Sequence, residues 1–395
     1  MKLKFFFGIL SVFSIHFAFA QSPKFILLDP ARLSSKKASY KQGESAVVKQ
    51  VQLVIKAADK LLDDKPASVM EKAFTPPSGS KHDYMSMAPY FWPDPNKADG
   101  LPYIRRDGEH NPEIKKITDD DFLNEMVSKC KFLSLAYYFT GDEKYANKAS
   151  QLIKVWFIDS ETRMNPNLNY AQAIRGVNDG RGIGIIESRC LCNLVDWMAL
   201  LKGSRLFTFE GGVKAWYKDY LNWLLTSKNG IDEHNAKNNH GTHYDTQVIS
   251  YALYLGDTAL AKKTLEADKK RIALQIEPDG RQMLELERTN ALGYSSMNLI
   301  GWSNIATLAG KINVDIWNYT TTDGRSLHKA FNWLAPYALG EKPWTEYKQI
   351  SPFKKDDFYQ LLVVASNKYG EVDYIKKSTS IKKNDKIQLT DLLYN

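Results

Sequence analysis

Amide, imidazole, guanidinium and phenol side chains gather in two segments of this chain. They are residues 234–245, with Asn239, His240 and His243, and residues 285–294, with Arg288 and Tyr294. Residues six apart do not share one helix face, so Arg288 and Tyr294 need a bend between them to reach the same pocket. We expect that bend near Gly293.

Such groups suit removal of a proton from a carbon beside a carboxylate, as in β-elimination on a uronic acid. The carbanion adds charge next to an existing anion, so hydrogen-bond donors must first neutralise the carboxylate. Asn239, His240 and Arg288 are suitable donors. Tyr294 is suited to act as base and as acid on one ring face, provided that neighbouring cations lower its pKa from about 10. This set works without a cofactor.

Other functional interpretations of the polar residues have less support in the sequence. His234, His240 and His243 are zinc-ligand types, but no nearby carboxylate completes an evident site, so we expect no catalytic metal. The run from Gly180 to Gly184 lacks the strand of a phosphate-binding fingerprint and is better read as a tight loop, from which Arg181 reaches substrate. The three cysteines, Cys130, Cys190 and Cys192, are read as buried structural residues.

The N-terminus is typical of an exported protein. Lys2 and Lys4 precede an apolar run that ends in small residues at Ala18 and Ala20, which predicts a signal peptide over residues 1–20, cut before Gln21. Its removal takes two lysines and no acids, leaving 51 basic against 45 acidic residues and a formal charge of +6. We therefore expect a periplasmic or secreted protein without a membrane anchor. Because the lysines and arginines are spread along the chain, a nucleic-acid partner is not expected.

Apolar residues at helical spacing predict helical hairpins. Thr118 and the three acids after it indicate a helix start, and a turn at Thr140-Gly141-Asp142 leads into a second helix. A similar pair recurs over residues 249–276, with its turn at Gly256. Further helices are expected at 46–62, 183–201, 212–226, 295–308 and 324–334.

This pattern predicts an all-α fold in one domain over residues 21–395. Repeated helical pairs close into an α/α toroid, or incomplete α/α barrel, whose long irregular loops lie over a central groove. An open helical solenoid or bundle is the alternative, since periodicity does not show closure. Residues 370–395 are expected to form a short strand pair or a peripheral tail.

A long loop over residues 74–117 holds seven of the fifteen prolines and many aromatic residues. A loop of this length inside a compact domain is usually functional, and its aromatic content favours order. We expect it to cover the groove and to contact sugar. The candidate residues are Lys81, His82, Tyr84, Tyr90 and Trp92.

An ordered set of motifs from about residue 80 to 335 resembles the alginate lyase superfamily of α/α-toroid enzymes. The motifs are Asn-Asn-His at 238–240, Glu-Leu-x-Arg followed by Leu-x-Tyr at 285–294, the segment 81–113 with Pro-Tyr-Phe-Trp-Pro at 89–93, and the segments 165–172 and 180–187. The set together is more specific than Asn-Asn-His alone.

The resemblance implies roles for individual residues. Asn239 and His240 match the carboxylate neutralisers, Arg288 the supporting cation and Tyr294 the proton-shuttling tyrosine, while Gln172 lies in a matching segment as a substrate-binding candidate. This chain has His243 where the family often has an aromatic residue, so the working histidine is His240, His243 or both. The implied substrate is alginate, cut to products with an unsaturated uronic acid. We expect the protein to be a monomer.

Three alternatives stay open at this point. A lyase on glucuronan or a glycosaminoglycan needs the same carboxylate chemistry. A toroid glycoside hydrolase needs two carboxylic acids, for which Asp83, Asp94, Asp245 and Glu287 are the candidates. A non-catalytic glycan-binding protein predicts binding without new chain ends.

Overall fold

The computed structural model describes residues 24–370, 374, 381 and 384–395. The expected signal peptide and its cleavage position before Gln21 lie outside these residues. Within the described ranges, no helix is both long enough and apolar enough to cross a membrane.

The two predicted helical hairpins are present. The first joins α3 (Asp119–Thr140) to α4 (Glu143–Phe157), and the second joins α8 (Asn239–Leu255) to α9 (Thr258–Gln275). Gly141 and Gly256 end the first helix of each pair in the left-handed conformation, with φ of 75° and 88°, which glycine adopts without steric strain. Asp142 and Asp257 then cap the second helix through their carboxylates.

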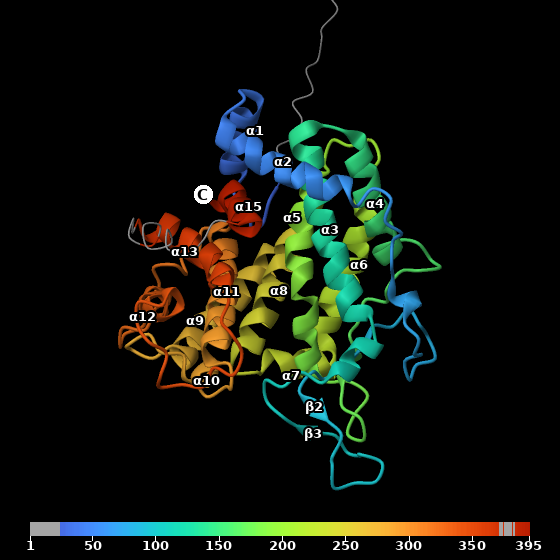
Figure 1. Ribbon diagram of the computed structural model, residues 1–395, viewed down its shortest axis with the longest axis vertical. Helices are drawn as coiled ribbons and strands as arrows, with labels where there is room; N and C mark the ends of the chain where they lie inside the picture. Colours follow the sequence, from blue (N-terminus) through green and yellow to red (C-terminus); the bar gives the residue numbers. More distant parts are fainter. Residues whose placement is uncertain (1–23, 371–373, 375–380, 382–383) are drawn as a thin grey trace, which may run out of the picture.

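The helices form an inner and an outer row. On the inner row α3 packs against α5 (Leu191–Leu200), α5 against α8, and α8 against α11 (Ala291–Gly310). The outer helices α4, α6 (Glu210–Thr226), α9 and α12 (Leu327–Leu339) pack on this row. The remaining helices among the described residues are α1 (Pro30–Lys41), α2 (Ser45–Asp59), α7 (Lys228–His234), α10 (Met283–Leu286), α13 (Lys355–Tyr369) and α15 (Asp385–Tyr394). The expected α/α toroid is thus confirmed (Figure 1).

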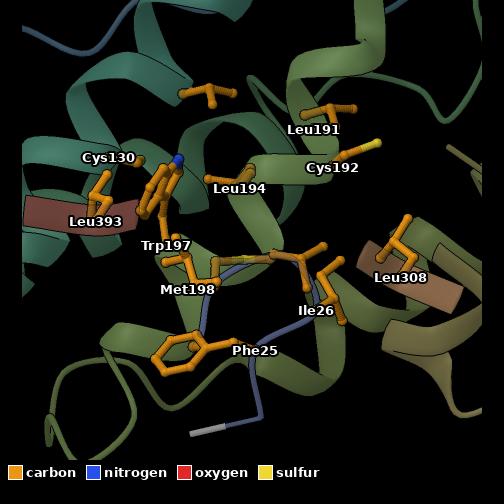
Figure 2. Close-up of a cluster of buried hydrophobic side chains, with 14 of the residues drawn as sticks. Phe25, Ile26, Cys130, Leu191, Cys192, Leu194, Trp197, Met198, Leu308 and Leu393 are labelled. Atoms are coloured by element: carbon orange, nitrogen blue, oxygen red, sulfur yellow. The ribbon is translucent and has the colours of Figure 1, made fainter. Parts of the chain in front are cut away.

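The N-terminal segment is fastened to the inner row through α5. Asp196 of α5 is fully buried and accepts the backbone N–H groups of Ile26, Leu27 and Leu28 at 2.7, 2.9 and 2.6 Å. Figure 2 shows Phe25 and Ile26 beside apolar side chains of α5, including Trp197 and Met198. Burial raises the pKa of the Asp196 carboxyl to about 6, opposed by those three bonds. The N-terminal segment therefore lies at one end of the inner helices, and the polar cluster described below lies at the other end (Figure 1).

Two expectations about secondary structure were wrong. The helix predicted over 183–201 is α-helical only from Leu191, and its first half is the 3-10 segment η3 (Gly182–Cys190). The C-terminal residues that were expected to form strands or a tail include α15, which packs against α2 and α13 and buries Ile387, Leu392 and Leu393. Burial of these three apolar side chains shows that the segment is a packed helix and not an exposed tail.

The loop over residues 74–117 is ordered around short elements. Strand β1 (Met85–Met87) pairs in parallel with β4 (Tyr170–Ala173), and β2 (Phe91–Trp92) pairs antiparallel with β3 (Ile104–Arg105). Two 3-10 segments, η1 (Val69–Glu71) and η2 (Pro112–Lys116), lie near its ends. Figure 1 shows β2 and β3 at the lower end of the molecule, where α7 and α10 also lie.

Candidate active site

A pocket of about 600 Å³ lies where α8 and α11 begin, and we call it the central pocket. Among the described residues that line it, none is Asp or Glu, whereas four are arginines: Arg105, Arg181, Arg189 and Arg288. The remaining polar lining comes from Tyr90, Gln172, Asn238, His240 and Tyr294. This composition favours an anionic ligand that carries hydroxyl groups.

The first turn of α8 borders the central pocket. Asn238 caps this helix by accepting the N–H of His240 at 3.3 Å, and both residues line the pocket. The positive end of the α8 dipole therefore lies at the pocket, where it favours an anion. Gly241 is required here, because a Cβ would lie 2.1 Å from the Ala236 carbonyl oxygen and from the Arg271 guanidinium.

His240 is oriented by a buried carboxylate. Its Nδ1 lies 2.8 Å from Oε1 of Glu233, which is 1% exposed on α7. With Nδ1–H donated to Glu233, Nε2 of His240 is the ring nitrogen available to a ligand. Sequence reasoning missed Glu233, although it stands seven residues before His240, because its position next to the imidazole depends on how α7 folds back on α8.

Asn239 is held behind the pocket by a second carboxylate. Its backbone N–H and its Nδ2 donate to the two oxygens of Glu285 at 2.6 and 2.7 Å. Asn239 is fully buried and does not line the central pocket. Its Oδ1 has no hydrogen-bond partner among the described residues. The sequence predicts that the Asn239 amide faces the substrate. In the structure that amide is bonded to Glu285, and the neighbouring Asn238 lines the central pocket instead.

Arg288 and Tyr294 meet because the chain breaks between two helices. The break lies at residues 287–290, between α10 and α11, and not near Gly293 as expected, since Gly293 lies inside α11. The Arg288 guanidinium carbon lies 3.8 Å from the centroid of the Tyr294 ring. A cation at this distance stabilises negative charge on the phenol.

Asp107 fixes Arg288 and ties the long loop to the site. Arg288 donates from Nε and Nη2 to the two Asp107 oxygens at 3.1 and 2.7 Å, which leaves Nη1 outside this pair. Thr289 adds its N–H and hydroxyl to the same carboxylate. Gly108 makes this approach possible, because it has φ +79° and a Cβ there would lie 2.4 Å from the Thr289 hydroxyl.

The Tyr294 hydroxyl donates to the Tyr90 hydroxyl at 2.7 Å, which joins α11 to the long loop across the central pocket. Burial raises the pKa of Tyr294, the Tyr90 hydroxyl adds to the rise, and Arg288 opposes it. The net direction is opposite to the lowering expected from the sequence, because loss of solvent outweighs the single adjacent cation. Tyr294 is therefore a neutral phenol in this structure.

The three clustered histidines have three different partners. His243 lies one turn after His240 but is buried, with Nε2 3.2 Å from the Met297 carbonyl oxygen. Burial, with lesser effects of Arg189 and His240, lowers its pKa to about 3. The exposed ring of His234 faces Asp245 at 3.3 Å. Only His240 of the three lines the central pocket.

Three of the seven predicted substrate-binding residues line the central pocket: Tyr90, Gln172 and Arg181. Arg181 donates from Nη2 to the Gln172 side-chain oxygen at 2.8 Å and lies 5.1 Å from the Phe91 ring centroid. Gln172 adopts φ 51°, a left-handed conformation that is unusual for a residue with a side chain. Its N–H donates to the buried Ser86 hydroxyl, which holds this turn of the chain.

The other four, Lys81, His82, Tyr84 and Trp92, do not line the central pocket. Tyr84 is fully buried and donates to Glu187 at 2.8 Å, so it packs the long loop against the protein core. Nδ1 of His82 is bonded to the Arg163 carbonyl oxygen, and the Trp92 indole donates to the Glu109 carbonyl. Aromatic content alone could not tell these packing residues from Tyr90. Conversely, the pocket arginines Arg105 and Arg189 were missed, since no motif marks them.

The four acids considered for a hydrolase lie outside the central pocket. Asp83 is bonded to Asn165 and Asn167, Asp94 to Asn96, and Asp245 to Arg271. Glu287 is exposed. The described structure therefore offers no pair of these carboxylates on opposite sides of a sugar in that pocket.

Glu187 gives the fold a testable dependence on pH. It is buried, and burial raises the pKa of its carboxyl from 4.5 to about 8, with Asp120 adding to the rise. Between pH 4.5 and about pH 8 the unfolded chain has released the Glu187 proton and the folded protein still holds it. The free energy of unfolding therefore falls as the pH rises through this range. We expect Glu187→Gln, which retains acceptors for Tyr84 and Ser86 but cannot ionise, to lose less thermal stability than wild type between about pH 5 and 8. Melting curves at both pH values measure this, and an identical loss in the two proteins would refute it.

Comparison with known proteins places this arrangement in a class of enzyme. The model of the family described as alginate lyase matches residues 68–344. A crystal structure of an alginate lyase from Bacteroides ovatus is 39% identical, with a TM-score of 0.89, and covers 94% of this chain and 99% of its own. Alginate lyase A1-III from Sphingomonas species A1 is 15% identical, with a TM-score of 0.55, over 94% of this chain and 97% of its own. No curated protein sequence matched the chain.

The fold and the family match define a polysaccharide lyase on an α/α toroid. The chain belongs to the alginate lyase family. A further similar structure, a histidine variant of alginate lyase A1-III complexed with a tetrasaccharide, has a TM-score of 0.62 at 15% identity, over 96% of this chain and 97% of its own, and supports the fold.

Proposed function

We propose that this protein cleaves alginate at mannuronate residues by β-elimination. The observation that carries the proposal is the central pocket itself, where four arginines and a helix N-terminus surround His240 and Tyr294 and no described lining residue is a carboxylate. The family and the alginate lyase from Bacteroides ovatus support alginate as the polymer. The tetrasaccharide complex of alginate lyase A1-III supports a sugar-chain ligand for this fold.

The first task of the site is to neutralise the C5 carboxylate of the sugar. We assign it to Nε2 of His240, which becomes a donor once it has accepted the Tyr294 proton, to the amide of Asn238, and to Nη1 of Arg288. The buried carboxylate of Glu233 positions the imidazole, and the partly buried carboxylate of Asp107 positions the guanidinium. Glu285 holds Asn239 behind the pocket at the start of α8. Donors fixed in advance stabilise the developing enediolate without reorganisation.

The second task is to move the C5 proton to the O4 leaving oxygen. The C5–H and C4–O4 bonds break, a C4–C5 double bond forms, and the proton ends on O4. In mannuronate both positions lie on one ring face, so a single group serves as base and acid. We assign this to Tyr294, which gives up its own proton first. His240 shares the pocket and is the group that takes that proton, and Arg288 over the Tyr294 ring stabilises the phenolate.

His243 and the outer loop residues have no direct role in this proposal. His243 is buried against the Met297 carbonyl, so we assign the catalytic imidazole to His240 alone. Of the loop residues, Tyr90 contacts substrate beside Tyr294, with Gln172 and Arg181 across the pocket. No cofactor is needed for this chemistry. We further propose export after cleavage before Gln21, and action as a monomer.

Incubation with purified polymers tests this function. The protein is mixed with polymannuronate, polyguluronate or glucuronan, and the conjugated product is followed by ultraviolet absorbance. We expect polymannuronate to be cleaved fastest and polyguluronate slowest, because its C5 proton lies on the opposite ring face from O4. Faster cleavage of glucuronan would reassign the polymer, and no absorbance with any polymer would refute the lyase proposal.

Glu233→Gln tests how His240 is held. The amide keeps the size of Glu233 but not the charge that pairs with Nδ1–H at 2.8 Å. We expect kcat on polymannuronate to fall about tenfold to a hundredfold, as for loss of a charge-assisted hydrogen bond, with KM nearly unchanged. Steady-state kinetics measure the two constants separately. A rise in KM at unchanged kcat would show that Glu233 acts on binding instead.

A further inference from the structure

A second basic groove lies beyond the central pocket, along the same helix. Residues of α11 and its C-cap, at three- and four-residue spacing, line successive pockets: Met297 in the central pocket, then Ile300, Asn304, Thr307 and the C-cap Lys311. This stripe covers about 20 Å of helix length. We call the space along residues 300–311 the distal groove, and it consists of pockets of about 330 and 390 Å³ that share Asn304 and Gln360.

A smaller space of about 190 Å³ borders both the central pocket and the distal groove. That space shares Gln172 and Arg189 with the central pocket and Asn124 of α3 with the distal groove. Its acidic residues are Asp120, Asp121 and Glu187, opposed by Lys115 and Arg189. Burial raises the pKa of the Glu187 carboxyl to about 8 and also raises the pKa of Asp120, which favours the neutral forms of both, and Lys115 pairs with Asp121 at 2.6 Å. These effects reduce the repulsion of an anionic chain.

The first part of the distal groove has the lining of a site for an acidic sugar. Two lysines, Lys131 of α3 and Lys386 of α15, stand on it, and none of its described lining residues is Asp or Glu. Amides of Asn193, Asn304 and Gln360, the half-buried ring of Tyr394 and an edge of the otherwise buried Trp197 complete it. Lysine pairs with carboxylates, amides with hydroxyl groups, and aromatic faces with sugar rings.

Lys131 shows the electrostatic cost of this arrangement. It is half-buried, and no carboxylate among the described residues lies within ion-pair distance of its ammonium group, which sits 4.6 Å from the Phe132 ring centroid. Burial lowers the pKa of Lys131, and repulsion from Lys386 lowers it further. A bound carboxylate would remove both penalties. In the second part of the groove, Arg32, Lys311 and Lys368 face one acid, Asp29.

We propose that the distal groove binds the uronate chain on one side of the cleaved bond, so that the enzyme holds long polymers more tightly than short ones. The proposal rests on the proposed function for the identity of the chain, and on the lysines and amides of the groove for its location. The occupant is an acidic polysaccharide that runs from the central pocket past Asn124 toward Lys131 and Lys311.

Binding is measured without turnover, by calorimetry of polymannuronate with Tyr294→Phe protein, with and without Lys131→Gln. We expect Lys131→Gln to weaken binding about fivefold and to reduce its dependence on salt. Asn304→Asp, which preserves shape but adds a repelling charge, should weaken binding at least as much. Lys56→Gln, which removes an exposed charge from α2, is the matched control and should leave the dissociation constant unchanged.

Turnover of the shortest oligosaccharide that the enzyme cleaves separates this inference from the proposed function. We expect Lys131→Gln and Asn304→Asp to cleave it at the wild-type rate while KM for long polymannuronate rises. Equal polymer affinity in wild type and both variants would overturn the distal site even if the enzyme is a lyase. Weaker polymer binding in both variants would support the site even if no unsaturated product forms.

Discussion

Tyr294→Phe is expected to lower kcat on polymannuronate by about a thousandfold while the polymer still binds. The change removes one hydroxyl, which donates to Tyr90 in this structure, and keeps the ring under Arg288. If that hydroxyl carries the proton from C5 to O4, no other phenol can replace it from the same position. Initial rates of ultraviolet absorbance give kcat, and calorimetry gives the affinity.

Two further tyrosine variants make this result specific. Tyr90→Phe removes the partner hydroxyl and should reduce kcat by no more than about tenfold, because Tyr90 orients Tyr294 and contacts substrate but transfers no proton. Tyr319→Phe, outside the central pocket, controls for loss of a phenol elsewhere. If kcat fell further in Tyr90→Phe than in Tyr294→Phe, Tyr90 would be the phenol that transfers the proton and Tyr294 the one that orients it.

The second large effect is expected for His240→Ala, with kcat reduced about a hundredfold to a thousandfold, as for removal of one preorganised donor at a developing anion. His240 lines the central pocket at the positive end of α8, and Glu233 fixes its ring. Loss of the imidazole leaves the substrate carboxylate less neutralised and removes the acceptor for the Tyr294 proton. Steady-state kinetics on polymannuronate measure the loss.

His234→Ala is the matched control for this prediction. Its ring is about half exposed, faces Asp245 and lies outside the central pocket. It should retain nearly wild-type kcat. If His234→Ala lost as much activity as His240→Ala, the histidine cluster would act through the folding of the 234–245 segment and not through one catalytic imidazole.

Much of the fold could be predicted because its signals are local. The apolar stripe of α3 and the glycine–aspartate turns after α3 and α8 specify helical hairpins without knowledge of distant contacts. The extended 3-10 segment η3 could not be predicted in this way. Its backbone conformation is set by packing of η3 against α7, α8 and β4, which lie elsewhere in the sequence.

The site was predictable to the extent that motif residues carry it. His240, Arg288 and Tyr294 converge on the central pocket, as their types suggested. Their supporting carboxylates were not foreseen, because Glu233, Glu285 and Asp107 come from three separate segments and become partners only in the folded chain. The raised pKa of Tyr294 has the same origin, since burial cannot be read from neighbouring residues in the sequence.

The long loop shows the limit of residue type as evidence. Tyr84 and Tyr90 lie six residues apart in the same aromatic-rich segment, yet Tyr84 is fully buried against Glu187 and Tyr90 faces the central pocket. An irregular segment has no periodicity from which to read its inner and outer faces. The same applies to Arg105, which reaches the pocket from the short β3 strand.

The most direct test of the reaction is the mass of the smallest products formed from polymannuronate. Elimination splits the chain without adding water, so the piece that carries the new non-reducing end should be lighter by one water than a saturated oligosaccharide of the same length. It should also absorb ultraviolet light and be absent with Tyr294→Phe. Products that are all saturated, each with the mass of a hydrolysed fragment, would contradict a lyase in which Tyr294 moves the proton and arginine, histidine and amide groups neutralise the carboxylate.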